Sequence, residues 1–224
     1  MLARHTFFLC MLLLLGQAAQ AQPAADSLYR QTLGFHQRLY NGPEYIRTYL
    51  NMSGHPFLEQ DSMALDTIWY DHSRYDGVPL NYDIVRQQVI TRGAQIFSIS
   101  LVPEKIEAFS LNGRYFRRLD TVVDNRRLTG MYEVLHAGES LVLAYRYKEA
   151  KAASGSDEQG RFIPHRRFYV VRNGRVFTVE KANQLYQVFA DRREQVKELL
   201  QQSPDFKTKP ESILIATARL SETK

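Results

Sequence analysis

Residues 105–119 read KIEAFSLNGRYFRRL, and this stretch decides the fold class. The dipeptide Asn112-Gly113 lies between two runs that are rich in aromatic and aliphatic residues. A two-residue turn that matches the twist of its strands needs positive φ at both central positions, which Asn followed by Gly tolerates. We therefore predict a hairpin in which 105–111 pairs with 114–119.

The same turn signal occurs twice more, at Asp76-Gly77 and at Asn173-Gly174. Both dipeptides are again flanked by residues that favour strands. The signal predicts two further hairpins, with strands at 67–75 and from Val78 onward, and at 166–172 and 175–179. Three such signals in one chain indicate an antiparallel sheet.

Further strands fill the middle of the chain. Phe97, Ile99 and Leu101 alternate with serines, which is the pattern of a half-buried strand. The other predicted strands are 84–90, 131–136 and 140–148, and the polar stretch 149–160 is predicted to be an exposed loop. We predict an α+β fold that is mostly antiparallel β, a meander of about nine or ten strands that curls into a partial barrel or a curved sheet.

Both ends of this sheet region are predicted to be helical. Residues 26–39 show a weak amphipathic pattern that ends at Asn41-Gly42-Pro43. From Leu185 to Leu200 apolar residues follow three-four spacing, and a last helix is predicted to begin at Pro210. We therefore predict a short N-terminal helix and two C-terminal helices.

The first 21 residues resemble a secretory signal peptide. Arg4 and His5 precede the apolar run Phe7–Leu15, and Ala19-Gln20-Ala21 has the small residues of a cleavage site. The only cysteine, Cys10, lies inside this run, so a mature chain would have none and could form no disulfide. We predict an exported protein of the periplasm or the extracellular space, without a membrane span.

We predict a single α+β domain for the mature chain, 22–224. Its parts are a helical and loop region at 22–64, the β meander at 65–180 and a helical region at 181–224.

The chain is moderately basic, with 29 Lys and Arg against 24 Asp and Glu. In an exported protein the anionic partners to expect are lipid head groups and acidic polysaccharides, and we predict no nucleic acid partner. Four Arg-Arg pairs occur, at 117–118, 126–127, 166–167 and 192–193. Adjacent residues of a strand point to opposite faces, so such a pair does not by itself form a basic patch.

No catalytic motif can be identified. Five histidines follow the predicted signal peptide, at 36, 55, 72, 136 and 165, and none has the spacing of a metal-ligand motif. Asp71-His72-Ser73 has the residue types of a hydrolase triad, but triad members meet through folding and are rarely adjacent. Four aspartates near the first hairpin, at 66, 71, 76 and 83, fit no calcium-loop pattern. We predict no catalytic residue, no metal and no cofactor.

Aromatic residues are dense between Tyr40 and Tyr82. Tyrosine offers an apolar ring with a polar tip, which suits a sugar or a protein surface. The alternative is that these rings pack on the sheet, where aromatic residues are favoured in any case. As a hypothesis, this region is the contact surface, and the candidate binding residues are Tyr45, His55, Phe57, Trp69 and Tyr75.

Short motifs in the same region resemble a group of uncharacterised exported proteins from Bacteroidota. The motifs are Tyr40-Asn41-Gly42-Pro43-Glu44-Tyr45, Gly54-His55-Pro56-Phe57, Tyr75-Asp76-Gly77-Val78-Pro79-Leu80 and Tyr82-Asp83. The resemblance implies an exported, β-rich protein and assigns no activity and no catalytic residue.

Three functions follow from this pattern. The first is a non-enzymatic exported protein that binds a protein or a cell-envelope component, and the sequence favours it. The second is a periplasmic carrier that encloses a hydrophobic or lipid ligand in a curved sheet, which a tightly filled interior would exclude. The third is an enzyme whose site is assembled from residues distant in sequence.

Overall fold

A computed structural model describes residues 38–93, 97–123, 125–202 and 205–222. The chain divides into two compact units, 1–41 and 42–224. The described part of the first unit contains one short 3-10 helix, η1 (Arg38–Tyr40). The predicted signal peptide and nearly all of the predicted helix 26–39 lie outside the described residues. The fold below is that of 42–224.

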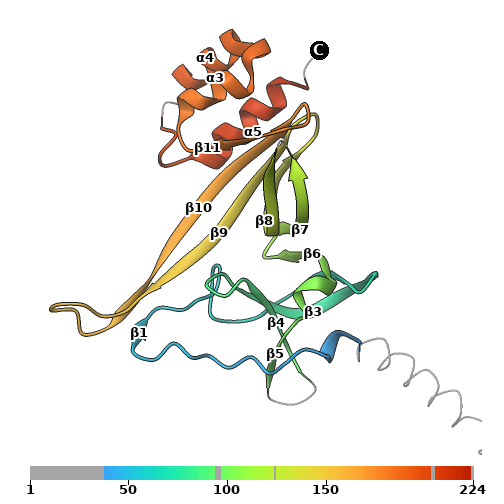
Figure 1. The fold of residues 1–224 in the computed structure, drawn as a ribbon, viewed down its shortest axis with the longest axis vertical. Helices are drawn as coiled ribbons and strands as arrows, with labels where there is room; N and C mark the ends of the chain where they lie inside the picture. The colour runs from blue at the N-terminus through green and yellow to red at the C-terminus, as the bar shows by residue number, and fades with distance from the viewer. Residues whose placement is uncertain (1–37, 94–96, 124, 203–204, 223–224) are drawn as a thin grey trace, which may run out of the picture. The chain divides into compact units, whose positions relative to one another are not determined.

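A single sheet dominates this unit, and the predicted fold class is confirmed (Figure 1). It is curved and unclosed, and it has eleven strands where nine or ten were predicted. The strands are β1 (Met52–Ser53), β2 (Ala64–Tyr70), β3 (Ser73–Asp83), β4 (Gln88–Arg92), β5 (Ser98–Ser100), β6 (Ile106–Leu111), β7 (Arg114–Val123), β8 (Arg126–Ala137), β9 (Leu141–Lys151), β10 (Gly160–Arg172) and β11 (Arg175–Val179), with a 3-10 turn, η2 (Pro103–Lys105), before β6.

The strands form two antiparallel meanders, β2 to β5 and β6 to β10, and β2 pairs with β6 to join them. At the far end β10 pairs with β11, and its first residues pair in parallel with β1. These β2–β6 and β1–β10 pairings connect segments that are distant in sequence.

Two of the three predicted hairpins are confirmed. Leu111 pairs with Arg114 around Asn112-Gly113, and Arg172 pairs with Arg175 around Asn173-Gly174. All four turn residues have positive φ, as this turn type requires.

The hairpin predicted at Asp76-Gly77 is wrong. The turn is at Asp71-His72, where φ is 52° and 63°, and Gly77 lies inside β3 beside an irregularity in the β2–β3 register. The reason is tertiary, because the end of η2 and the start of β6 stabilise the turn. Asp71 donates its backbone N–H to the Lys105 carbonyl, and the His72 backbone N–H donates to the Glu107 carboxylate.

One row of side chains crosses the covered face of the sheet. Each member is the cross-strand partner of the next, and all are buried: Tyr75, Ile68, Phe109, Phe116, Glu133, Ala144 and Phe168. Phe109 stacks on Phe116 with ring centroids 4.8 Å apart, and Tyr82 meets both rings edge to face. We call the seven cross-strand partners named above the inner row, and Glu133 is its one charged member.

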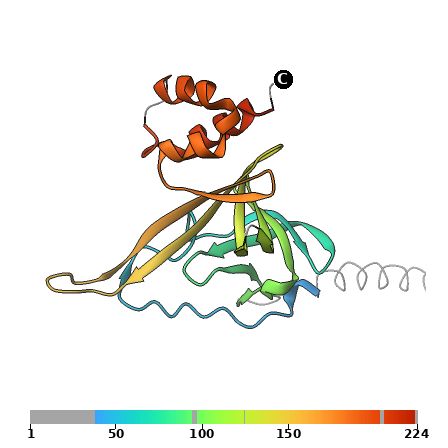
Figure 2. The ribbon, with the colours of Figure 1, turned by 45° about the horizontal axis from the view of Figure 1, so that its top comes forward.

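Helices cover the inner row where it crosses β9 and β10 (Figure 2). They are α3 (Leu185–Val188), α4 (Arg193–Gln202) and α5 (Pro210–Leu220), and two 3-10 turns, η3 (Ala182–Gln184) and η4 (Ala190–Arg192), flank α3. Leu185, Val196 and Leu214 pack with Phe168 in one apolar cluster. The predicted start of the last helix at Pro210 is confirmed.

The helix predicted from Leu185 to Leu200 is interrupted after Val188. Phe189 leaves the helical region at φ −118° and ψ 50°. Arg172, 8% exposed, causes the break, because its guanidinium donates to the Val188 carbonyl, forms two hydrogen bonds of 2.5 and 2.9 Å with Asp191 and lies 4.9 Å from the centre of the Phe189 ring. A buried guanidinium needs such partners, and these positions cannot supply them in a continuous helix.

The Asp191 carboxylate predicts acid sensitivity. Its hydrogen bonds from Arg172 lower its pKa from 3.8 to about 2. A carboxylate with a lowered pKa stabilises the fold above its unfolded pKa, and this contribution is lost as the pH falls through the folded value. Because Asp191 is half exposed, we expect Asp191→Asn to lower the free energy of unfolding by less than about 1 kcal/mol above pH 4.

Urea denaturation between pH 2 and pH 6 would measure this difference. We expect the difference between Asp191→Asn and the wild-type chain to shrink toward pH 2. Glu194→Gln, at an exposed position with one lysine partner, serves as the control. A difference that stays constant across the series would contradict the prediction.

The segment 42–60 connects both edges of the open sheet, and we call it the strap. Its start extends the β5 edge, where Tyr45 donates its N–H to the Ser98 carbonyl. Its middle forms β1 on β10, and its end reaches the last residues of β3, where Leu58 donates to the Tyr82 carbonyl. The strap therefore holds the curl of the sheet.

Candidate binding surface

A groove lies on the face of the sheet opposite the inner row. Its floor is Ala108 in β6, and the cross-strand partners of Ala108 are Trp69 in β2 and Arg117 in β7. Partners across adjacent strands point to the same face, so three successive strands form this surface. Its volume is about 480 Å³, and its lining is Trp69, Glu104, Ile106, Glu107, Ala108, Tyr115, Arg117, Arg118 and Asp120. We call it the Trp69 groove.

Two aromatic rings form one wall of the Trp69 groove. Trp69 and Tyr115 meet edge to face with ring centroids 5.8 Å apart. Tyr115 is 40% exposed, and the Arg74 guanidinium lies 5.6 Å from the centre of the Trp69 ring. Trp69 is half-buried and Tyr115 is exposed, and large aromatic side chains that reach the solvent over an apolar floor are typical of a contact surface.

The charged groups of the groove differ in their partners. Glu107 lies 3.1 Å from His72, and Asp120 lies 3.2 Å from Arg127. Arg118 donates to the Pro103 carbonyl, and no acid of the described residues forms an ion pair with it. Arg117 and Glu104 have no hydrogen bond or ion pair within the part of the chain that the structure describes. The groove thus offers a cation and an anion for an incoming ligand.

Beyond the groove, the cross-strand partners on this face lead into a second buried cluster. Arg117 pairs with Tyr132 in β8, whose ring meets Tyr145 in β9 at 5.3 Å, and Tyr145 pairs with Arg167 in β10. We call the set on this face the outer row. It consists of Trp69, Ala108, Arg117, Tyr132, Tyr145 and Arg167.

Further rings accompany the outer row on β9 and β10. Tyr147 meets Tyr145 at 5.9 Å, and His165 stacks on Tyr147 at 4.9 Å. Arg167 is exposed, and its guanidinium lies 5.4 Å from the centre of the Tyr147 ring. Tyr132 itself is 4% exposed and packs with Leu128, Leu143 and Val176 in a buried cluster, and this burial raises the pKa of its hydroxyl to about 12.

Three of the five predicted binding residues lie together on the strap. The Phe57 ring is 6.1 Å from Tyr45 and 6.0 Å from His55. The Tyr45 hydroxyl donates to the buried Asp83 carboxylate at 2.8 Å, and Phe57 is 4% exposed. Burial, followed by the Asp83 hydrogen bond, raises the pKa of Tyr45. These contacts attach the strap to the sheet and leave little ring surface for a ligand.

Lys148 completes this attachment from β9. Its ammonium donates to the His55 carbonyl at 3.0 Å and to the Phe57 carbonyl. Burial lowers the pKa of Lys148, and burial together with the nearby lysine charge lowers the pKa of His55. His55 is not among the residues that line the Trp69 groove.

The other two predicted residues lie apart from the strap. Trp69 lines the groove, whereas Tyr75 belongs to the inner row and is 1% exposed, so a ligand cannot reach its ring. Sequence reasoning missed Tyr115 and Arg117. Counting from the Asn112-Gly113 turn would have placed Arg117 opposite Ala108, but the pairing of Ala108 with Trp69 has no local signal.

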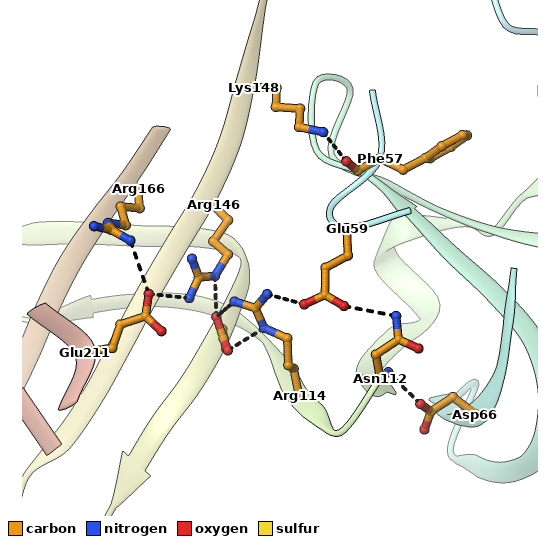
Figure 3. Close-up of polar contacts among 10 residues, drawn as sticks. Phe57, Glu59, Asp66, Asn112, Arg114, Arg146, Lys148, Arg166 and Glu211 are labelled. Carbon is orange, nitrogen blue, oxygen red and sulfur yellow. Dashed lines mark hydrogen bonds and ion pairs between the residues drawn. The ribbon is translucent and has the colours of Figure 1, made fainter. Parts of the chain in front are cut away.

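The covered face carries a chain of alternating charges (Figure 3). Glu133 accepts two hydrogen bonds of 2.8 Å from Arg114 and another from Arg146. Arg114 also donates to Glu59 of the strap at 2.6 Å, and Arg146 lies 2.9 Å from Glu211 of α5.

Every charge in this chain has an opposite neighbour. Burial disfavours ionisation of both Glu59 and Arg114, but their hydrogen bonds outweigh it, so the pKa of Glu59 is lowered and that of Arg114 is raised. Glu211 receives a further contact from Arg166 at 3.6 Å. With three acids and three arginines, the chain has no net charge to offer a ligand, and its role is to tie the strap, the sheet and α5 together.

A second groove of about 580 Å³ lies beside the β10–β11 turn and α3. Its charged residues are Arg172, Arg175 and Asp191, and of these Arg172 and Asp191 bind each other. In the described ranges no group of three or more His, Cys, Asp or Glu side chains could hold a metal ion, and no helix there is long and apolar enough to cross a membrane.

Comparisons with protein-family models, with curated protein sequences and with solved structures gave no match.

Proposed function

We propose that the chain is a non-enzymatic binding protein of an exported compartment, and that its ligand, a protein or a cell-envelope component, docks in the Trp69 groove. The observation that carries the proposal is the pair formed by half-buried Trp69 and exposed Tyr115, beside Arg117, which has no partner among the described residues. Tryptophan, tyrosine and arginine dominate the energetics of binding sites, because they combine large apolar area with hydrogen-bonding groups.

The carrier has less support than the binding protein. A carrier needs an enclosed apolar space, whereas the inner row fills the covered face with packed rings, of which Phe109 and Phe116 are each at most 1% exposed. The Trp69 groove and the groove beside α3 are both open to solvent. An enzyme has less support too, because His55, the histidine whose pKa is lowered, does not line the Trp69 groove or the groove beside α3.

The single tryptophan makes the proposal directly testable, because Trp69 fluorescence reports on the groove alone. The full chain would be titrated with an envelope fraction of the producing cells, and bound protein would be measured by co-sedimentation. We expect a change in Trp69 emission, and we expect Tyr115→Ala to weaken binding about tenfold, as for loss of a central aromatic contact.

Phe97→Ala is the matched control, because it removes another exposed ring, 55% exposed, outside the groove. Circular dichroism would confirm that both variants are folded. If no envelope fraction binds, or if Tyr115→Ala binds as well as Phe97→Ala, the groove is not the binding site and the proposal fails.

A further inference from the structure

The Trp69 groove is a short site that ends within the sheet. It lies across β2, β6 and β7, which is two strand spacings or about 10 Å. Beyond β7 the outer row is closed to a ligand, because Tyr132 is 4% exposed and Tyr145 packs against the buried cluster to which Tyr132 belongs. The volume of about 480 Å³ is within the usual range for small-molecule sites. The groove therefore accommodates a small molecule or the end of a chain.

The floor of the groove lies between aromatic and charged side chains. Ala108 is the cross-strand partner of Trp69 on one side and of Arg117 on the other. Tyr115, 40% exposed, is two residues before Arg117 in β7 and therefore points to the same face. A ligand that lies over the small Ala108 side chain has aromatic rings and a guanidinium within reach.

The charges of the groove disfavour a ligand with a net charge of either sign. Glu104, Glu107 and Asp120 line it together with Arg117 and Arg118. An anion would meet three carboxylates, and a cation would meet two guanidiniums. A hydroxyl group avoids both costs, because it donates a hydrogen bond to a carboxylate and accepts one from a guanidinium. The lining is therefore complementary to a neutral ligand with several hydroxyl groups.

Two of these charged groups are available for such hydrogen bonds. Glu104 and Arg117 are exposed, and neither has a hydrogen bond or an ion pair among the described residues. A carboxylate has two acceptor oxygens, and a guanidinium presents several donors in a planar fork, so each can bind two neighbouring hydroxyl groups. The groove thus combines one free acceptor group and one free donor group with aromatic rings.

A protein partner fits this groove less well than a small ligand. A stable protein interface covers about 800 Å² on each partner, with an apolar centre. Of the large hydrophobic side chains that are exposed in the described ranges, Tyr115 is the one that lines the groove, and the others are Ile46, Leu50, Leu65, Phe97 and Val122. A pyranose sugar instead has C–H faces that stack on aromatic rings and a rim of hydroxyl groups, which matches the lining.

We propose that the Trp69 groove binds a neutral sugar of one or two rings, either free or at the end of a glycan. The proposal rests on the proposed function, because it names the ligand of the same groove. The C–H face of the sugar packs on Tyr115 and Trp69, and its hydroxyl groups bind Glu104 and Arg117.

The test titrates the full chain with glucose, galactose, mannose, N-acetylglucosamine, maltose, cellobiose and diacetylchitobiose, by isothermal titration calorimetry and Trp69 fluorescence. We expect at least one of these neutral sugars to bind with a Kd below about 1 mM and to change Trp69 emission. Its Kd should stay the same between about 50 and 300 mM NaCl, because a neutral ligand has no charge for salt to screen. Glucuronate and glucosamine should bind at least about fivefold more weakly than this sugar, because each meets like charges in the groove.

Variants of the lining locate the sugar. Tyr115→Ala should weaken binding about tenfold, whereas Tyr115→Phe, which keeps the ring, should change it less than about twofold. Glu104→Gln and Arg117→Gln should each weaken binding about fivefold to tenfold, since hydrogen bonds to charged groups are the stronger ones. Arg175→Gln is the matched control, because Arg175 is an exposed arginine that lines the groove beside α3. If Arg175→Gln weakens binding as much as Arg117→Gln, the Trp69 groove is not the sugar site and the proposal fails.

The remaining outcomes separate this inference from the proposed function. If an envelope fraction changes Trp69 emission but none of the seven sugars binds, the groove is a binding site and the sugar assignment is wrong. Loss of that emission change after the fraction is treated with a proteinase would then identify a protein as the ligand. Equal or tighter binding of glucuronate or glucosamine, or a Kd that rises with salt, would show recognition of charge and would also overturn the assignment.

Discussion

Replacing Glu133 with glutamine is expected to lower the free energy of unfolding by about 3 to 5 kcal/mol, which is the usual cost of breaking a buried ion pair from one side. Glu133 is 5% exposed, and its carboxylate accepts hydrogen bonds from both Arg114 and Arg146. Glutamine keeps the size of the side chain but leaves two enclosed guanidiniums without their shared counter-charge. Since domains are stable by about 5 to 15 kcal/mol, the loss is large enough to lower the midpoint of unfolding clearly.

Urea denaturation followed by circular dichroism measures this loss. Glu107→Gln is the control, because Glu107 is a half-exposed acid of the same sheet with a single histidine partner, and we expect it to change stability by less than about 1 kcal/mol. The double variant Glu133→Gln/Arg146→Gln should lose less than the sum of the single losses, because the second change removes one of the uncompensated charges. A loss below about 1 kcal/mol for Glu133→Gln would show that the chain of charges contributes little to stability.

The local part of the fold could be predicted from the sequence. Asn112-Gly113 and Asn173-Gly174 carry turn chemistry within two residues, and both turns form where predicted. Asp76-Gly77 carries the same chemistry, yet the chain turns at Asp71-His72, because Lys105 of η2 and Glu107 of β6 accept hydrogen bonds from that turn. Turn preference is therefore decisive only where no distant strand favours a different turn.

The candidate site depends on pairings that leave no local trace. Trp69 and Arg117 are both cross-strand partners of Ala108 in β6, although 48 positions separate them in the sequence. Arg114 and Glu133 bind each other on the neighbouring strands β7 and β8. The place of Glu133 in the inner row could not be predicted either, because its neighbours in β8 are ordinary strand residues that do not mark it as buried. The aromatic density from Tyr40 to Tyr82 was a usable signal, but it did not separate the half-buried ring of Trp69 in the groove from the buried ring of Tyr75.

Asp83 is the second position at which a single substitution should have a large effect, because it connects the strap to the sheet. Its carboxylate is fully buried and accepts hydrogen bonds from the backbone N–H groups of Val85 and Arg86 and from the Tyr45 hydroxyl. Asp83→Ala leaves these three donors without an acceptor. We expect a loss of about 3 kcal/mol, whereas Tyr45→Phe, which removes one of the three bonds, should cost about 1 kcal/mol.

The loss of stability in Asp83→Ala should appear first in the strap. If Asp83 holds the strap on the curled sheet, hydrogen exchange in Asp83→Ala should accelerate first at the strap amides that bond to the sheet, such as those of Tyr45 and Leu58. The amides of the β9–β10 pairing should keep their protection until global unfolding. Thr67→Ala, which removes an exposed side-chain hydrogen bond to Asp76, is the control and should leave strap exchange unchanged. Uniform acceleration across all strands in Asp83→Ala would instead mean that the strap and the sheet unfold as one unit, and that the curl of the sheet does not depend on Asp83 alone.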